Sequence, residues 1–345
     1  MNAETEILVK AINSFFYVYL PKQRCYSKNT VDSYKTAFNL FLDYMLEQRD
    51  SPLHQMTLTD LNKDNLSGFV DWLATVRQNS PGTCNQRLMA FRSFAKHVGI
   101  KDFALASVYA DVCSVPTKKK ATKVVDFLSE EGLKTLLIQP DTSKRTGIRN
   151  QCFMCLMYDT AARCQELLDS RLNDLSLSGN APFIYLTGKG NKTRAVPLMK
   201  TTVNHLLNYL KIFHPDSKNQ MDAYLFYTTS HGEHHPMSRD TVQLFMKEYG
   251  RTAREVCPDI PEQVHPHQLR HTRAIHLYRG GMPLSILSEF LGHASEETTR
   301  IYAYADTEMK RKAIEKATPK AIPGNETPIW DASDDETLRR LAGLR

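Results

Sequence analysis

The sequence predicts a mainly α-helical protein of two domains, with a small antiparallel β-sheet in the second domain. Apolar residues recur three and four positions apart over much of the chain, as they do on the buried face of a helix. Two short strand-like runs flank a glycine-rich turn near residue 190. A lysine-rich stretch at residues 116–124 separates the two regions, and 345 residues suffice for two hydrophobic cores.

The first domain, residues 1–115, is predicted to be all-helical. A helix should begin after a cap at Ser27 or Asn29, because short polar side chains accept hydrogen bonds from the free N–H groups of a first helical turn. The stretch Ser80-Pro81-Gly82-Thr83 should interrupt the helices. The apolar residues that mark three helices are Val31, Tyr34, Phe38, Phe41 and Leu42, then Phe69, Trp72, Leu73 and Val76, then Leu88, Phe91, Phe94 and Ala95.

The second domain, residues 125–318, is predicted to combine helices with one β-hairpin. Phe127-Leu128 is typical of the end of a strand, and Ser129 followed by two acids predicts the start of a helix. The two hairpin strands are expected at residues 183–186 and 195–198, around a turn at residues 188–191. Helices are expected to dominate from Thr202 onward.

Residues 319–345 are predicted to form a tail with a short helix near its end. Leu338, Leu341 and Leu344 recur every three residues, after a candidate cap at Ser333. Such a short helix is marginal by itself in water, so it needs a surface to pack on. That surface is either the chain's own second domain or a neighbouring protomer.

The positive charge of the chain is concentrated in one place. The net charge is +6, and residues 116–124 contain no acid. Four lysines carry the excess there: Lys118, Lys119, Lys120 and Lys123. Such a run is either a solvated linker or a linker that lies against the phosphates of a nucleic acid.

Composition narrows the class of protein and its compartment. No run of eighteen apolar residues is present, and the N-terminus lacks the basic-then-apolar pattern of a signal peptide. The seven cysteines are scattered without the spacing of a disulfide framework. The sequence therefore predicts a cytoplasmic protein with no membrane partner.

Several residues suited to phosphate chemistry follow one another along the second domain. Arg163 and Glu166 are three positions apart, as are His267 and Arg270, so each pair would share one face of a helix. Arginine grips phosphate oxygens with a planar fork, and histidine donates a hydrogen bond or moves a proton. A tyrosine, Tyr302, comes after both pairs. Each pattern alone is common by chance, so their combination carries the argument.

Four segments, in one order along the chain, resemble the tyrosine recombinases, the family of the phage integrases and Xer chromosome-dimer resolvases. These segments are TAARCQELL, LTGKGNKTRAVPL, HPHQLRHTRAIHL and LGHASEETTRIYAY. The 26-residue spacing from His267 to His293 fits the family pattern as well. Residues 27–34 and 83–88 resemble the family's core-binding domain, so the resemblance covers roughly residues 10–317. It implies a two-domain DNA clamp, with the basic linker joining the core-binding and catalytic domains.

The resemblance also implies which residues do the chemistry. The seven positions that match the family's catalytic residues are Arg163, Glu166, Lys189, His267, Arg270, His293 and Tyr302. The two arginines would grip the scissile phosphate, the acid would support the site, and the tyrosine would attack. His267 could accept the tyrosine's proton, and the hairpin lysine would protonate the leaving oxygen. Fixed positive donors suit the charge that builds on phosphate oxygens during the attack.

The implied function is site-specific DNA recombination. Attack by the tyrosine would form a 3′-phosphotyrosine ester, which keeps the bond energy, so no cofactor or metal is expected. Four copies of the chain would act on double-stranded DNA with inverted-repeat core sites, with or without accessory recombinases or DNA-bending proteins. They would exchange strands through a Holliday junction during integration, excision or transposition of a mobile element. The four linker lysines would contact the DNA backbone, and the protein would be associated with the nucleoid.

Other functions stay open on the sequence alone. One is a catalytically silent DNA-binding regulator, which the filled catalytic positions disfavour. Another is strand relaxation by a single protomer, as in type IB topoisomerases, which the match in the N-terminal domain disfavours. A metal-dependent nuclease is the weakest alternative, and resistance to EDTA would remove it.

Four positions depart from the family pattern or compete within it. Ala161 stands where the family often has glycine, so a positive φ there would be strained. Leu172 stands where many relatives have tryptophan. Tyr304 competes for the role of nucleophile and Lys192 for that of the hairpin lysine. The family spacing favours Tyr302 and the first of the two lysines.

Two clusters imitate metal sites. Cys152 and Cys155 form a C-x-x-C pair, but they lie in an apolar helical run, which favours core thiols. A second group is expected in a surface loop before a helix cap at Ser238. Its members are His231, Glu233, His234 and His235. We expect neither cluster to hold a metal.

Overall fold

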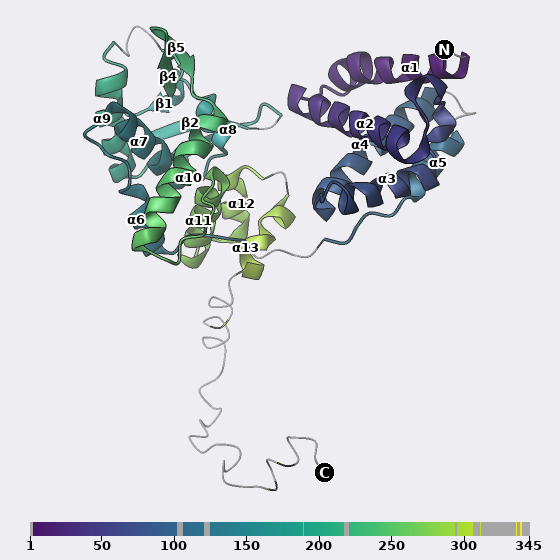
Figure 1. Cartoon of the computed structure of the whole chain (residues 1–345). Coiled ribbons are helices and arrows are strands. Elements are labelled where there is room, and N and C mark those ends of the chain that lie inside the picture. Colours follow the sequence, from purple (N-terminus) through teal and green to yellow (C-terminus); the bar gives the residue numbers. More distant parts are fainter. Residues whose placement is uncertain are drawn as a thin grey trace. The chain divides into compact units, whose positions relative to one another are not determined.

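The computed structural model describes residues 3–101, 106–120, 125–188, 190–216, 221–293 and 295–305, together with Arg311, Glu336 and Arg339. The chain divides into two compact units, Met1–Lys123 and Val124–Arg345, which we describe separately (Figure 1). Helices dominate both units, and the strands of the described residues belong to the second. The predicted fold class, mainly α with small antiparallel β-structure, is confirmed.

The first unit is built from helices, several of them with polar caps. Ser27 caps α2, because its Oγ accepts a hydrogen bond from the backbone N–H of Thr30 at 3.4 Å. Ser80 does the same for Thr83 at 3.2 Å where α4 begins. The elements are α1 (Ala3–Ser14), the π-helix η1 (Phe15–Gln23), α2 (Lys28–Arg49), the 3-10 turns η2 (Leu53–Gln55) and η3 (Leu58–Asp60), α3 (Lys63–Thr75), α4 (Pro81–Lys101) and α5 (Ala106–Ser114).

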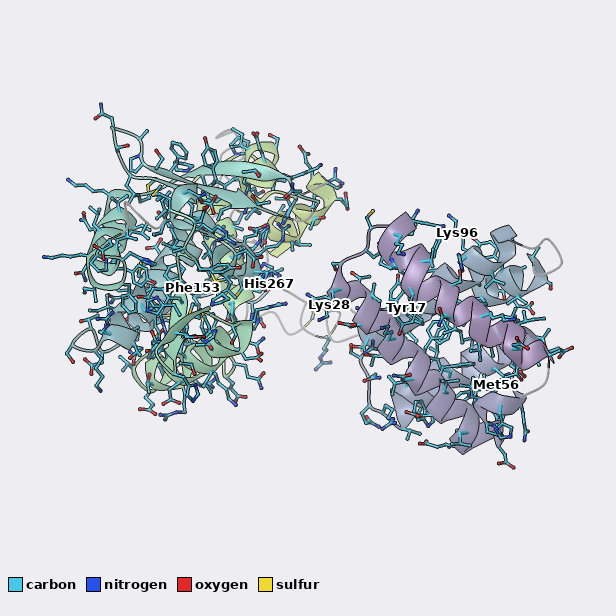
Figure 2. The ribbon with its side chains drawn as sticks, turned by 90° about the horizontal axis from the view of Figure 1, so that it is seen from above. Tyr17, Lys28, Met56, Lys96, Phe153 and His267 are labelled. Carbon is cyan, nitrogen blue, oxygen red and sulfur yellow. The ribbon has the colours of Figure 1, made fainter. Side chains whose placement is uncertain are left out.

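Aromatic rings fill the core of the first unit. Phe38 stacks on Phe91 with 4.6 Å between ring centroids, and Phe15 meets Phe94 edge-on at 5.2 Å. Such pairs add to the free energy gained by burying large apolar surfaces. Met56, labelled in Figure 2, belongs to the same buried cluster.

The lysine-rich stretch begins by packing on the first unit. Asn85, on α4, donates a hydrogen bond from Nδ2 to the carbonyl of Lys118 at 2.9 Å and accepts one from its N–H at 2.8 Å. The Lys118 ammonium also pairs with Asp71, 2.9 Å away. Lys119 and Lys120 are exposed, and Lys123 lies outside the described residues.

The second unit packs its helices around a large hydrophobic cluster and a smaller one. The central helix is α7 (Arg145–Thr160), and its Phe153 is fully buried inside the unit (Figure 2). Ser129 and Ser238 cap α6 and α10, as the sequence predicts. The remaining elements are α6 (Glu130–Leu137), α8 (Cys164–Leu168), η5 (Leu172–Asp174), α9 (Lys200–Phe213), α10 (Arg239–Val256), α11 (Pro266–Arg279), α12 (Leu284–Leu291), η7 (Glu296–Thr298) and α13 (Arg300–Ala305).

A three-stranded antiparallel sheet lies in the second unit. Its strands, in spatial order, are β1 (Leu175–Ser176), β2 (Phe183–Thr187) and β3 (Thr193–Pro197). The β2–β3 pair is the hairpin predicted from the sequence, and its last paired residues are Thr187 and Thr193. Leu172, at the departure from the family pattern, is buried in the neighbouring core with 4% exposure.

Two local predictions are wrong. Phe127-Leu128 does not end a strand, because the backbone N–H of Leu128 donates to the Thr272 hydroxyl of α11 at 3.0 Å, a partner 144 residues away. The histidine-rich segment is not an open loop. It forms a second antiparallel hairpin from β4 (Tyr227–Ser230) and β5 (Glu233–Pro236). The first contact depends on the tertiary structure, and β5 is exposed without an alternating apolar pattern, so local sequence patterns revealed neither feature.

The predicted tail helix falls outside the part of the chain that the structure describes. This applies to Leu338, Leu341 and Leu344, which carried the prediction. In the described part, no helix combines the length and apolar character needed to cross a membrane.

Candidate active site

A tight reversal after α7 creates one corner of the site. Ala161 ends α7 in the left-handed conformation, with φ 47° and ψ 31°. Alanine therefore keeps a turn that glycine would form at lower conformational cost. The reversal places Arg163 at the N-cap of α8, where its backbone N–H donates to Glu166 Oε2 at 2.9 Å. A carboxylate at the third position of a helix commonly binds the N-cap in this way.

Glu166 is a buried carboxylate shared by two arginines. Its side chain is 4% exposed, with Oε1 2.7 Å from Arg163 Nη1 and Oε2 2.8 Å from Arg194 Nη2. Burial pushes the pKa of Glu166 upward, but the hydrogen bonds and charges of Arg194 and Arg163 outweigh burial and lower it. The carboxylate is therefore ionised at neutral pH and supports both guanidinium groups.

Arg270 is buried between two chain segments. Its Nη1 donates to the carbonyl of Ala161 at 2.6 Å, and its Nη2 donates to the carbonyl of Leu291 at 2.7 Å. The residue is 2% exposed, and burial, followed by the charge of Arg163, lowers the pKa of Arg270 to about 10. The guanidinium stays protonated at neutral pH and joins the reversal after α7 to the end of α12, which lies beside α11 in Figure 1.

Tyr302, the predicted nucleophile, lies on α13 and is 1% exposed. Its hydroxyl is hydrogen-bonded to Nδ1 of His271, 2.9 Å away. Burial raises the pKa of Tyr302, against the opposing charges of Arg270 and Arg163. Burial, followed by His267 and Arg270, lowers the pKa of His271 to about 4, so its ring is neutral at pH 7. The phenol is thus held by a neutral imidazole.

The two histidines predicted from the sequence lie near these groups. His293 is hydrogen-bonded through Nδ1 to the Thr299 hydroxyl at 2.8 Å, and burial with the charge of Arg270 lowers its pKa to about 4. The ring of His267 lies 5.4 Å from that of His271, centroid to centroid, and burial lowers its pKa as well. The described contacts therefore place His271, rather than His267, at the Tyr302 hydroxyl.

A cavity of about 420 Å³ opens beside Arg163 and His267. Its other lining residues are Cys164, Gln165, Arg239, Gln243, His265 and Pro266, from α8, α10 and the start of α11. Guanidinium and imidazole groups on the walls, with no carboxylate in the lining, suit an anion such as a phosphate.

The hairpin lysine and one rival nucleophile are not placed. Lys189 lies outside the described residues, and so does the side chain of Tyr304. Lys192, the rival lysine, is exposed at the β2–β3 hairpin. The choice between each pair stays a prediction.

Two residues of the site were missed in the sequence. Arg194 is two positions before the buried Val196 on β3, so strand alternation places both on the inward face. An arginine on an inward face indicates a buried acidic partner, which was the available signal. His271 offered a weaker signal, because it shares a helix face with His267 four residues earlier.

The two metal-like clusters have structural contacts instead. Cys152 is buried in the large core, where burial raises the pKa of its thiol. His234 stacks on Tyr227 in the second hairpin, with 4.0 Å between ring centroids. Within the residues described, no three His, Cys, Asp or Glu side chains are grouped to hold a metal ion.

Comparison with known families identifies the chain. Residues 126–309 match the sequence model of the phage integrase family, and residues 14–101 match the phage integrase N-terminal SAM-like domain. The first match alone spans more than half of the chain.

The chain belongs to the phage integrase family of tyrosine recombinases.

This recombinase is therefore an enzyme that cleaves and rejoins DNA in site-specific recombination, as the sequence predicts. It is 31% identical to tyrosine recombinase XerD of Listeria monocytogenes over 304 residues, which cover 87% of this chain and 96% of that protein. It is 28% identical to the putative integrase/recombinase y4rC of Sinorhizobium fredii over 313 residues, covering 90% and 92% of the two chains.

Solved structures share the recombinase's fold. The Tn1549 transposon integrase in complex with transposon right end DNA has a TM-score of 0.67 at 15% identity, covering 88% of this chain and 98% of that one. The XerH site-specific recombinase bound to palindromic difH substrate, in a post-cleavage complex, has a TM-score of 0.63 at 20% identity, covering 91% and 90%.

Proposed function

We propose that this recombinase cuts duplex DNA with Tyr302 as its nucleophile and rejoins it through a 3′-phosphotyrosine ester. The observation that carries the proposal is the placement of Tyr302 and His271 beside Arg270. Arg270 donates to the carbonyl of Ala161, which is two residues before Arg163 and its partner Glu166. A tyrosine, two guanidinium groups and an anion-sized cavity together fit attack on a phosphodiester.

The reaction proceeds by exchange of one ester for another. The Tyr302 oxygen bonds to phosphorus, its proton leaves through a neighbouring base, and the bond from phosphorus to the 5′-oxygen breaks. The 5′-oxygen takes a proton and departs as a hydroxyl, for which Lys189 is the proposed acid. The reverse attack by a 5′-hydroxyl restores the DNA, so no ATP or other energy source is needed.

The tyrosine must leave its present contact before it can attack. Tyr302 is 1% exposed and bonded to His271, so a phosphate cannot reach its hydroxyl while these contacts persist. The transfer of the phenol proton to an imidazole whose pKa is about 4 is strongly unfavourable in the free protein. Bound phosphate would raise the pKa of the nearby histidines, since an anion favours the charged imidazolium. His267 stays the proposed proton acceptor in the DNA complex, with His271 holding the phenol beforehand.

Strand exchange requires more than one copy of the chain. We propose that four protomers assemble on two DNA sites with inverted-repeat core sequences and pass through a Holliday junction. The related proteins XerH and Tn1549 integrase are described in complexes with difH substrate and transposon DNA, which supports duplex DNA as the partner. Integration, excision or transposition of a mobile element would be the setting, and DNA binding would place the protein at the nucleoid.

The exposed linker lysines are the proposed contacts to the DNA backbone. Lys119 and Lys120 are free to reach phosphates, whereas the Lys118 ammonium is engaged by Asp71. Lys123 completes the set proposed from the sequence. Contacts of this kind position a protein on DNA without reading its sequence.

The test is covalent trapping on a nicked suicide substrate made from the DNA that flanks the gene, where inverted repeats would mark the core site. The wild type should form a protein–DNA adduct on a denaturing gel, with or without EDTA. Tyr302→Phe should bind the same DNA and form none, because only the hydroxyl is removed. Trapping by Tyr302→Phe combined with none by Tyr304→Phe would reassign the nucleophile.

A second assay distinguishes recombination from the alternatives. Two intact sites on one plasmid should yield recombinant products and Holliday junctions with the wild type. Relaxation of supercoils without strand exchange would favour the topoisomerase alternative, and binding without any adduct would favour the silent regulator.

A further inference from the structure

Arg194 links three separate parts of the second unit. Its Nη2 lies 2.8 Å from Glu166 Oε2, and its Nη1 lies 3.3 Å from Oε1 of the same carboxylate. Its Nε donates to the carbonyl of Phe290 at 3.1 Å, near the end of α12. One side chain from β3 thus binds the first turn of α8 and the segment that leads to His293.

The glycines around Arg194 leave the space that its side chain occupies. A Cβ on Gly292 would lie 2.9 Å from Arg194 Nη1, and Gly292 has a φ of +64°, which L side chains rarely adopt. A Cβ on Gly188 would lie 2.9 Å from Glu166 Oε1. Both glycines therefore permit the close approach of hairpin, carboxylate and α12.

Arg194 donates two of the four hydrogen bonds that the Glu166 carboxylate accepts from Arg163 and Arg194. Arg163 binds Glu166 through Nη1 and its backbone N–H, and Arg194 supplies the other two side-chain hydrogen bonds. Arg194 is 15% exposed at its side chain and Arg163 is 34% exposed. Arg163 therefore stays accessible to a ligand, while Arg194 is buried against the carboxylate of Glu166.

We propose that Arg194 is a positioning residue for DNA cleavage, which holds Glu166 so that Arg163 and the β2–β3 hairpin are correctly placed at the scissile phosphate. It acts through Glu166 and the Phe290–Gly292 segment and does not itself touch the reacting atoms. This inference rests on the proposed function, because it presupposes a phosphate bound by Arg163. The hairpin that it anchors is the one whose tip carries Lys189.

The first experiment measures single-turnover formation of the covalent adduct at saturating protein. Arg194→Met removes the charge at nearly constant length and should slow adduct formation by about 10–100-fold, the range known for losing a partner that orients a metal ligand. Arg194→Lys keeps the charge and should recover part of the rate. Affinity for the DNA should stay within about threefold of wild type, since binding is dominated by other phosphate contacts. Arg251→Met, on the exposed face of α10, is the matched control and should behave as wild type.

A double-variant cycle separates positioning from direct contact. If Arg194 acts through Glu166, then adding Arg194→Met to Glu166→Gln should slow cleavage by less than about threefold further. A further loss as large as in the wild-type background would show that Arg194 does not act through Glu166 and would overturn the proposal. Thermal melts accompany each variant, and Arg194→Lys keeps the test valid if Arg194→Met folds poorly.

The pH profile gives a readout that a general loss of stability would not produce. The charged groups that face Glu166 in the described structure are Arg163 from the N-cap of α8, Arg194 from β3 and Arg270 from α11. Loss of Arg194 leaves burial less compensated, so the pKa of Glu166 rises and cleavage by Arg194→Met should fall off at a higher pH than in the wild type. Glu166→Gln has no carboxylate to protonate, so its pH profile should lack this shift.

The outcome also separates this proposal from the proposed function. If wild type forms no adduct through Tyr302, the proposed function fails. If wild type forms the adduct and both Arg194 variants match it in rate and pH profile, only the role of Arg194 fails.

Discussion

Arg163 and Arg270, the two arginines proposed to bind the scissile phosphate, are held in opposite ways. Arg163 is 34% exposed and paired with the carboxylate of Glu166 at 2.7 Å. Arg270 is 2% exposed and bonded to two backbone carbonyls, and no carboxylate of the described residues lies within ion-pair distance of it. One guanidinium is ion-paired but accessible, and the other is buried without an ion-pair partner among the described residues.

The difference assigns the two arginines different tasks. A buried cation without an ion-pair partner is costly, and an incoming anion would lower that cost. Arg270 is therefore stabilised most by a bound phosphate. The lowering of its pKa to about 10 reflects the cost of burying its charge. Arg163 lines the cavity and is pre-aligned by Glu166, so its contribution is geometry.

The largest expected effect is on cleavage. Arg270→Met and Arg163→Met should each slow covalent adduct formation by about 10²–10³-fold, the range for losing one preorganised donor to a developing oxyanion. Inorganic phosphate should raise the melting temperature of wild type and of Arg163→Met, but much less that of Arg270→Met. Equal stabilisation of all three proteins by phosphate would erase the distinction between the two arginines.

The ion pair of Asp159 with Arg273 can be compared with that of Glu166 with Arg163, because we expect it to serve stability and not cleavage. Asp159 is 4% exposed, pairs with Arg273 at 3.1 Å and accepts the backbone N–H of Met199 at 2.8 Å. Asp159→Asn should destabilise the catalytic unit by about 2–4 kcal/mol, a drop of roughly 5–15 °C in Tm, because it breaks a buried pair. Below the transition, its cleavage rate should match wild type within about threefold. A cleavage defect as large as that of Glu166→Gln, in protein shown to be folded, would contradict the contrast between structural and catalytic pairs.

The histidines beside Arg270 make the stability of the folded protein depend on pH. His271 and His293 have folded-state pKa values of about 4, below the ordinary value near 6.5, so the folded protein binds fewer protons than the unfolded chain. Stability should therefore be complete above pH 6.5 and decline as the pH falls toward 4. His271→Gln should lose less Tm between pH 7 and pH 4.5, by about a few degrees, because one such histidine is gone. Superimposable Tm–pH curves for the two proteins would argue against a neutral, buried His271.

The smallest expected effect concerns the linker. Lys119→Ala with Lys120→Ala should weaken binding similarly on cognate and random DNA and flatten the salt dependence by about 0.9 per lost phosphate contact. Lys118→Ala should change the slope less, since its ammonium is engaged by Asp71. Titrations at several salt concentrations measure both. A salt slope that changes only in Lys118→Ala would invert the assignment of exposed and engaged lysines.

The sequence predicted what depends on nearby residues. Ser27, Ser129 and Ser238 cap helices as expected, because a cap needs only its own first turn. The β2–β3 hairpin was also predictable, since apolar strands flank a glycine-rich turn. The second hairpin was missed because all four residues of β5 are exposed and carry no alternating apolar pattern.

The site shows the same limit. The three-residue spacing of Arg163 and Glu166 predicted their ion pair, although Arg163 stands at the N-cap of α8 and not within the helix. The bond between Tyr302 and His271 spans 31 residues and depends on how α13 docks on α11, which no local pattern reports. Arg194 reaches Glu166 across 28 residues, from a strand to a helix. Resemblance to the family predicted the catalytic positions, but it did not predict these two tertiary contacts.

The neutral histidines have a consequence for the charge of the site as a whole. With His267, His271 and His293 uncharged, the guanidiniums of Arg163, Arg194 and Arg270 around the carboxylate of Glu166 leave a surplus of two positive charges, and Arg239 on the cavity wall adds to it. A phosphodiester brings one negative charge, and the five-coordinate phosphorus that forms during attack carries two. The pocket is therefore electrostatically closer to the transition state than to intact DNA, which is the condition under which binding energy accelerates a reaction.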